Sequence, residues 1–310
     1  MREHEAYGLL LLASLIWTGN FLAGKLALQV VGPITLTALR ALLASPLLLW
    51  YVRLSYQTWP VASAADLRPF VILGLTGLVG STTLWYYGLR STLAVNAAIL
   101  GATGPIFVAI LSAGWLRERL SPVNLAGILL SSAGVILTVA RGSLQVLLDF
   151  DLHRGDFFIL AGQGAWAVSS VYGRHVARQF SPTVITTGVY LVGTVVLIPL
   201  ALVERPWTTL PNASLGVVLA VLYAAIVVTI SHVWYYWGMR VVPAPVAALT
   251  VNLIPFEVLA VSWLFLDEPV TWVHVAGALI VISGVGLATR KPSEGAPSRS
   301  SGVRTASGSS

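Results

Sequence analysis

The chain has 310 residues, of which 56% are hydrophobic and only 10% are charged. Soluble domains carry about 25% charged residues, so the composition excludes a soluble globular protein and predicts a surface that faces lipid. The net charge of +6 does not indicate nucleic-acid binding, because the basic residues lie in short loops and in the C-terminal tail. The absence of cysteine excludes disulfides and thiolate metal sites.

Long apolar runs separated by proline, glycine and charged residues predict membrane-spanning helices, each of which needs about 20 apolar residues. The runs are continuous and do not alternate with period two, which argues against a barrel of strands. We therefore predict an all-α integral membrane protein with ten transmembrane helices, at Tyr7–Leu28, Ile34–Val52, Pro69–Leu89, Val95–Trp115, Val123–Ala140, Asp156–Ala177, Thr183–Val203, Leu215–Met239, Pro245–Leu266 and Trp272–Thr289.

The two halves of the chain repeat one residue pattern. Residues of the first half recur 150 positions later, as in Tyr86 and Tyr236, Pro105 and Pro255, and Glu118 and Glu268. Such a register indicates a duplicated unit, and because five helices is an odd number, the second unit is predicted to be inverted. The predicted organisation is a five-helix repeat over residues 1–144, a linker loop over 145–154, an inverted five-helix repeat over 155–290 and a disordered cytoplasmic tail over 291–310.

The distribution of positive charge predicts the orientation. With ten spans both termini lie on one side of the membrane, and that side carries most of the Lys and Arg residues. The opposite side carries Arg90, Arg141, Arg154 and Arg205. The positive-inside rule then predicts that both termini are cytoplasmic.

The first three predicted spans carry polar and aromatic residues away from the loops. Trp17, at the centre of the first span, fills either the helix packing or a substrate cavity, and Asn20 offers both hydrogen-bond donors and acceptors. Arg40 lies inside the second span, where placing a charge in the membrane costs at least about 2.5 kcal/mol of free energy. It has either a structural role, in which it pairs with helix-end carbonyls, or a role in coupling transport to a driving force. Trp85 and Tyr86, near the end of the third span, form either an interfacial belt or a gate.

The fourth and fifth spans carry candidate bending and packing residues. Pro105, like its counterpart Pro255 in the ninth span, removes a backbone hydrogen bond and forms either a static kink or a hinge. Gly127 and Gly134 in the fifth span lie nearly two helical turns apart and share one face. They and their counterparts in the tenth span predict close helix packing.

The sixth and eighth spans repeat the polar and aromatic features of the first half. Gln163 and Trp166 lie near the middle of the sixth span, and Trp166 is the counterpart of Trp17. Trp234 and Tyr235 in the eighth span correspond to the aromatic residues of the third, at the opposite membrane face under the predicted inversion. We expect these residues, with Asn20 and the first-half aromatics, to line a substrate site.

The ninth span carries an amide and a carboxylate. Asn252 is a candidate substrate-binding residue. Glu257 has no counterpart, because the first half has Phe107 at the matching position. It binds a substrate ammonium, carries a proton, or pairs with Arg40 or Lys25, and the sequence leaves these roles open.

No residue pattern of an enzyme is present in the sequence. The five histidines are scattered without metal-ligand spacing, and there is neither a glycine-rich phosphate loop nor a close pair of buried acids. We predict that the protein is not an enzyme and uses no cofactor or metal.

Together these residues resemble the drug/metabolite transporter superfamily, in its ten-helix EamA-type branch. The resemblance covers about residues 7–290 and rests on the segment Trp17–Phe21 with Lys25, on Leu39 and Arg40, and on the Pro105…Leu116-Arg117-Glu118 and Pro255…Leu266-Asp267-Glu268 helices. An arginine at the place of Arg40 is common in that branch whatever the substrate, whereas Glu257 departs from the usual apolar residue. The interior rich in Trp and Tyr is most similar to YddG-type amino-acid exporters.

The resemblance implies a transporter in the inner membrane of a bacterium. It would export amino acids, including aromatic ones, and other small amphipathic metabolites by alternating access. Its cavity is expected among the first, third, fourth, sixth, eighth and ninth helices, with the fifth and tenth outside. One alternative is a proton-coupled exporter of cationic drugs, in which Glu257 and the aromatics bind the cation. Another is a membrane scaffold or scramblase that transports no solute.

Overall fold

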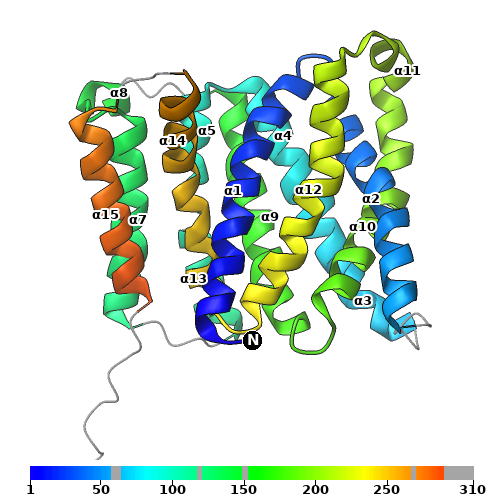
Figure 1. Cartoon of the computed structure of the whole chain (residues 1–310), viewed down its shortest axis with the longest axis horizontal. Helices are drawn as coiled ribbons and strands as arrows, with labels where there is room; N and C mark the ends of the chain where they lie inside the picture. The colour runs from blue at the N-terminus through cyan, green and yellow to red at the C-terminus, as the bar shows by residue number, and fades with distance from the viewer. Residues whose placement is uncertain (57–63, 117–120, 149–152, 267–269, 290–310) are drawn as a thin grey trace, which may run out of the picture.

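The computed structural model describes residues 1–56, 64–116, 121–148, 153–266 and 270–289, and within these ranges every regular element is helical (Figure 1). The predicted tail over 291–310, part of the predicted linker, Glu118 and Glu268 lie outside the described residues. The elements are α1 (Glu3–Ala27), α2 (Pro33–Tyr56), α3 (Ala64–Leu73), η1 (Gly74–Thr82), α4 (Thr83–Ser91), α5 (Ala94–Gly101), α6 (Gly104–Leu111), η2 (Ser112–Leu116), α7 (Pro122–Val139), α8 (Leu144–Leu148), α9 (Arg154–Val176), α10 (Pro182–Ala201), η3 (Leu202–Glu204), α11 (Pro206–Thr209), η4 (Leu210–Asn212), α12 (Leu215–Met239), α13 (Ala244–Ala248), η5 (Leu249–Leu253), α14 (Ile254–Leu266) and α15 (Trp272–Ala288).

An all-α membrane fold is confirmed by the length and apolar character of these helices. Within the described ranges, 7 helical segments are long and apolar enough to cross a membrane, and two shorter apolar helices cover Ala244–Ala260 and Trp272–Ala288. Helix α9 has 23 residues but carries several polar side chains, among them Gln163 and Ser169. The count of ten spans and the inverted repeat stay predictions.

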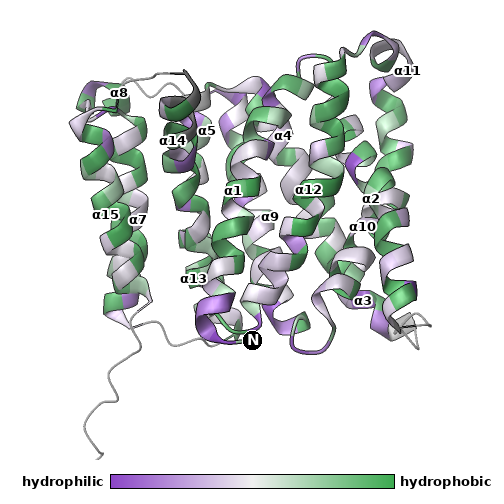
Figure 2. Cartoon of the chain, in the orientation of Figure 1, coloured by the Kyte–Doolittle hydropathy of each residue, from purple (hydrophilic) through white to green (hydrophobic). Residues whose placement is uncertain are grey.

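The outer faces of the bundle are apolar. Leu15 is 52% exposed, Val195 74% and Leu279 61%, and hydrophilic residues gather towards the helix ends (Figure 2). This distribution is the reverse of a soluble protein's, and it is stable where hydrocarbon surrounds the helices.

Several helices begin at sequence signals that satisfy their first backbone amides. The side chains of Ser121, Ser181 and Ser214 accept hydrogen bonds from the backbone N–H three residues later, at the starts of α7, α10 and α12. Pro122 and Pro182 follow two of these serines, and a proline is tolerated there because the first helical N–H has no partner within the helix.

Three of the predicted spans are interrupted by a turn or by a change of helix type. The predicted third span consists of α3, the π-helical η1 and α4; the fourth consists of α5, α6 and the π-helical η2; the ninth consists of α13, the 3₁₀-helical η5 and α14. Pro105 and Pro255 are the second residues of α6 and α14, because a proline cannot donate to the preceding turn. The carbonyl oxygen of Gly101, which Pro105 leaves without its helical donor, accepts a hydrogen bond of 3.0 Å from Gln163 Nε2.

The helices pack as neighbouring pairs across the molecule. Helix α1 packs along α12, α2 along α10, and α9 along η1 and α4. The pair α7 and α15 lies at one edge of the bundle (Figure 1). A Cβ at Gly127 would lie 2.4 Å from the backbone nitrogen of Ala288, and one at Gly284 would lie 2.5 Å from that of Ser131. The close packing predicted from the glycine spacing is confirmed.

Candidate functional site

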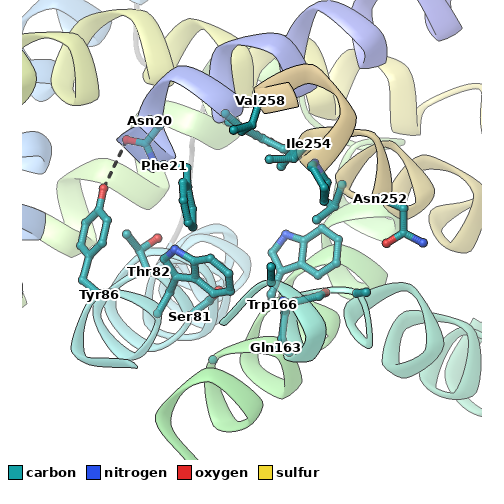
Figure 3. Close-up of a pocket in the computed structure, with 18 of the residues that line it drawn as sticks. Asn20, Phe21, Ser81, Thr82, Tyr86, Gln163, Trp166, Asn252, Ile254 and Val258 are labelled. Carbon is teal, nitrogen blue, oxygen red and sulfur yellow. Dashed lines mark hydrogen bonds between the residues drawn. The ribbon is translucent and has the colours of Figure 1, made fainter. Parts of the chain in front are cut away.

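A cavity of about 400 Å³ lies between residues of the two halves of the chain. The first half contributes α1, α2, η1, α4, α5 and α7, and the second contributes α9, α12, η5 and α14. Figure 3 shows Asn20 and Tyr86 on one side of the opening, Gln163 and Trp166 on another, and Val258 across from them. The volume lies in the range of small-molecule sites.

Most of the predicted site residues line this cavity. They are Trp17, Asn20, Trp85, Tyr86, Gln163, Trp166 and Asn252, together with Arg40 and Pro255. Four predicted residues do not line it. Tyr235 lines a smaller cavity next to it, Trp234 is half-buried and lines neither, Pro105 is buried in α6, and Glu257 contacts α1.

The three predicted amides differ in how much of their hydrogen-bonding capacity is used. Asn20 Oδ1 accepts a bond of 3.3 Å from the Tyr86 hydroxyl (Figure 3), whereas Gln163 uses its Nε2 to hold the Gly101 carbonyl. Asn252 Nδ2 donates to Ser131 Oγ at 3.0 Å. Its Oδ1 is buried and has no partner among the described residues. The three amides thus hold the interrupted helices to their neighbours, and the buried Oδ1 of Asn252 lacks a partner among the described residues.

Aromatic rings separate the main cavity from a smaller one of about 60 Å³. Trp17, Trp166 and His232 line both cavities. The ring centroid of Tyr235 lies 5.1 Å from that of Trp17 and 6.4 Å from that of Trp166. The smaller cavity continues along α12 towards Met239. The rings of Trp17, Trp166 and Tyr235 therefore close one end of the main cavity.

Arg40 lies in the wall of the main cavity and is almost completely buried, with 2% of its surface exposed. Its Nε and Nη2 donate to the Tyr190 hydroxyl at 3.1 and 3.0 Å, and Nη2 lies 3.3 Å from His232 Nδ1 and 3.4 Å from Nε2. These contacts, rather than the expected helix-end carbonyls or Glu257, hold the guanidinium.

Glu257 lies at the contact between α14 and α1. Its two carboxylate oxygens accept hydrogen bonds of 2.6 Å from Ser14 Oγ and 2.5 Å from Thr18 Oγ1. Of the roles that the sequence left open, pairing with Arg40 does not occur. Lys25 is exposed and no described contact joins it to Glu257.

Two features of the cavity differ from the sequence interpretation. The fifth predicted span was expected outside the cavity, but Val135 and Val139 of α7 line it, so that expectation is wrong. His232 also lines it and was missed, because the histidines were weighed only as metal ligands. An ionisable side chain inside an apolar span is the signal that would have found it.

Comparison with known proteins places the sequence in a family. The sequence model of the EamA-like transporter family matches residues 5–140 and again residues 153–290. An uncharacterized transporter of Archaeoglobus fulgidus is 31% identical, over 91% of this chain and 96% of its own length. The uncharacterized transporter YetK of Bacillus subtilis is 28% identical, over 92% and 86%. A crystal structure superposes with a TM-score of 0.73 at 21% identity, over 93% of this chain and 98% of the other.

These matches confirm the resemblance to the EamA-type branch of the drug/metabolite superfamily, whereas the similarity to YddG-type exporters stays a prediction. They indicate a transporter and not an enzyme, as the sequence predicts. With its apolar helices and the family match over both halves, the chain is a multi-pass membrane transporter that belongs to the EamA-like transporter family.

Proposed function

We propose that this transporter exports amino acids, including aromatic ones, and other small amphipathic metabolites through the cavity between its halves. The observation that carries the proposal is the lining itself, which combines indole rings of Trp17 and Trp166 with the amides of Asn20 and Asn252. Indoles suit an aromatic or aliphatic side chain, and an amide offers both the donors and the acceptors that a zwitterion requires.

Alternating access by two inverted halves is supported by the way in which the helices pair. Helix α1 of the first half packs along α12 of the second, and α9 of the second half packs along η1 and α4 of the first. Exchanging corresponding spans of the two halves converts one pairing into the other. The family model also matches each half separately.

The interrupted helices supply places where the halves can bend. The break between α5 and α6 adjoins the main cavity through Ala102. The 3₁₀ segment η5 adjoins it through Asn252. Irregular helix is tolerated at membrane depth where it lines a cavity, and discontinuous helices form the binding sites of many transporters. Bending beside Pro105 and Pro255 would open the cavity to one side at a time.

The orientation follows from the charges. Helix α1 begins and α15 ends at the same end of the bundle (Figure 1), and the excess of Lys and Arg at that end favours the cytoplasm. We place the protein in the cytoplasmic membrane of a bacterium, with both termini inside. The main cavity then lies in the outer half of the bundle, next to the ends of α1 and α7.

The alternative of a proton-coupled exporter of cationic drugs has less support. Among the described residues that line the cavity there is no Asp or Glu, and Glu257 is engaged by two hydroxyls of α1. A scaffold without a substrate has no need of an internal cavity with amide groups. Amino-acid export accounts for the lining better than either alternative.

Flux through liposomes tests the proposal. Purified protein in liposomes should take up labelled L-phenylalanine down its gradient faster than empty liposomes do. A broad panel of amino acids, from alanine to tryptophan, then defines the range. If no amino acid of the panel moves faster than in empty liposomes, the proposal is rejected and the scaffold alternative is favoured.

A further inference from the structure

Arg40 is a buried charge without a counter-ion in the part of the chain that the structure describes. Its hydrogen-bond partners are the Tyr190 hydroxyl and the His232 ring, and the Tyr86 hydroxyl also interacts with the guanidinium. None of these groups is a carboxylate. A buried ion that lacks an opposite charge carries most of its desolvation cost, so the site is electrostatically incomplete.

The hydrogen bonds fix the direction in which the guanidinium can act. His232 Nδ1 lies 2.7 Å from the carbonyl oxygen of Val228 and donates to it, so Nε2 is the ring nitrogen that accepts from Arg40. Nε and Nη2 of Arg40 are therefore used within the protein. Arg40 lines the main cavity, so a group that enters the cavity can reach its side chain.

The carboxylates of the described residues near the bundle are committed elsewhere. Glu257 accepts from α1, Glu204 accepts from the backbone N–H groups of Ile34 and Thr35 at the start of α2, and Asp156 accepts from Asn96 and from the backbone of His153. None of the three lines the cavity. The cavity wall thus carries a cation and lacks an anion among its described residues.

A second donor belongs to another residue that lines the same cavity, Trp17. The indole N–H of Trp17 is buried and has no hydrogen-bond partner within the described residues. The ring centroid of Trp17 lies 5.7 Å from that of His232, which Arg40 also contacts. A buried indole N–H normally finds a partner, and a carboxylate that accepts from both groups would satisfy it.

We infer that the cavity selects organic carboxylates, with Arg40 as the group that binds the carboxylate and Trp17, Phe21 and Trp166 as the wall that binds the apolar part. The inference rests on the proposed use of the cavity as the substrate site and narrows it. The carboxylate of an amino acid is the required group and its ammonium is dispensable. A charge-assisted hydrogen bond is about twice as strong as a neutral one, so a carboxylate is favoured over neutral and cationic groups at Arg40.

Two ligands that share their apolar part and carry opposite charged groups test this in the wild-type protein. 3-Phenylpropionate and phenethylamine share a phenyl ring on a two-carbon chain and carry a carboxylate and an ammonium respectively. Titration calorimetry with the full-length protein in nanodiscs, against empty nanodiscs, should show binding of 3-phenylpropionate and binding of phenethylamine that is weaker by about tenfold or more. Equal or tighter binding of phenethylamine, or binding of neither ligand, overturns the inference.

Variants of Arg40 locate the effect. Arg40→Gln should weaken 3-phenylpropionate binding by about tenfold or more, and Arg40→Lys should recover part of the loss because it keeps the charge. Arg178→Gln changes an exposed arginine near the end of α9 and should change nothing. Undiminished binding by a folded Arg40→Gln protein contradicts the inference. If Arg40→Gln does not fold, the comparison of the two ligands in the wild type still decides.

Flux separates this inference from the proposed function. If the wild-type protein moves L-phenylalanine and the Arg40→Gln protein moves it equally fast, the proposed function stands and the carboxylate site is rejected. If the wild-type protein moves no amino acid but binds 3-phenylpropionate, and this binding depends on Arg40, the carboxylate site stands and amino-acid export is rejected.

Discussion

The glycine seam between α7 and α15 and the cavity between the halves are two ways of packing membrane helices. In the seam, Gly127 and Gly284 face one another, and a Cβ at Gly284 would lie 2.7 Å from the carbonyl oxygen of Gly127. At the cavity, small residues such as Ala98 and Gly101 face indole rings and open space instead. Small side chains bring backbones together in one place and leave room for a ligand in the other.

The difference shows that a small residue has no single meaning in a membrane helix. What decides is the partner helix: α15 is continuous and can follow α7 closely over its length, whereas α5 ends at Gly101 and η5 interrupts the ninth span. Two continuous helices pack closely in the seam, whereas at the cavity the interrupted helices leave space beside the continuous helices α1, α9 and α12. The seam is therefore expected to support stability, and the cavity to support transport.

Filling the cavity should have the largest effect on transport. Ala98→Trp places an indole in the lining, and flux of labelled phenylalanine in liposomes should fall by about tenfold or more, because the new ring and the ligand cannot occupy one close-packed space. Ile110→Trp is the control, since Ile110 of α6 is 64% exposed to the outside and should tolerate a larger side chain. Equal loss in both variants would mean that the cavity is not the route.

Widening the seam should lower stability without closing the cavity. Gly284→Ala forces a methyl group against the backbone of α7, and overpacking of this kind costs about 1–3 kcal/mol. Gly286→Ala is the matched change two residues away on α15, where a Cβ meets nothing within 4 Å. Thermal unfolding in detergent should show a lower midpoint for the first variant alone. A midpoint unchanged by Gly284→Ala would show that α7 and α15 are not packed tightly.

Removing the charge of Glu257 should have the smallest effect. Glu257→Gln keeps the shape of the side chain. The single hydroxyl hydrogen of Ser14, which lies within reach of both Glu257 and the Leu11 carbonyl oxygen, can be donated to Leu11 in the variant. The change is worth about one net hydrogen bond, about 1 kcal/mol, so gradient-driven phenylalanine flux should change by less than about fivefold. Collapse of flux in this variant, with normal stability, would instead favour proton coupling through Glu257.

The sequence predicts the fold better than it predicts the site. Apolar runs and the paired glycines depend on local composition and helical periodicity, and both agree with the structure at α7 and α15. The interruptions near Pro105 and Pro255 also agree with the break in helical hydrogen bonding that the two prolines predict, and the choice between a static kink and a hinge stays open. By contrast, the partners of Arg40 are Tyr190 and His232, from α10 and α12. Periodicity carries no information on which distant helices meet.

The same limit explains Glu257. A carboxylate in an apolar span must find a partner, but only the packing of α14 on α1 shows that Ser14 and Thr18 supply it. Without that contact the sequence left substrate binding, proton transfer and ion pairing equally open. The sequence indicates which polar residues line the cavity, but it does not show which hydrogen bonds each of them makes.

A crystal structure with bound 4-bromo-L-phenylalanine, whose bromine gives an anomalous signal, tests the central claim most directly. We expect the bromine peak in the cavity beside Trp17 and Trp166, and density for the carboxylate at Arg40. A bromine peak only on the outer surface of the bundle, with the cavity unoccupied at saturating ligand, would contradict the account.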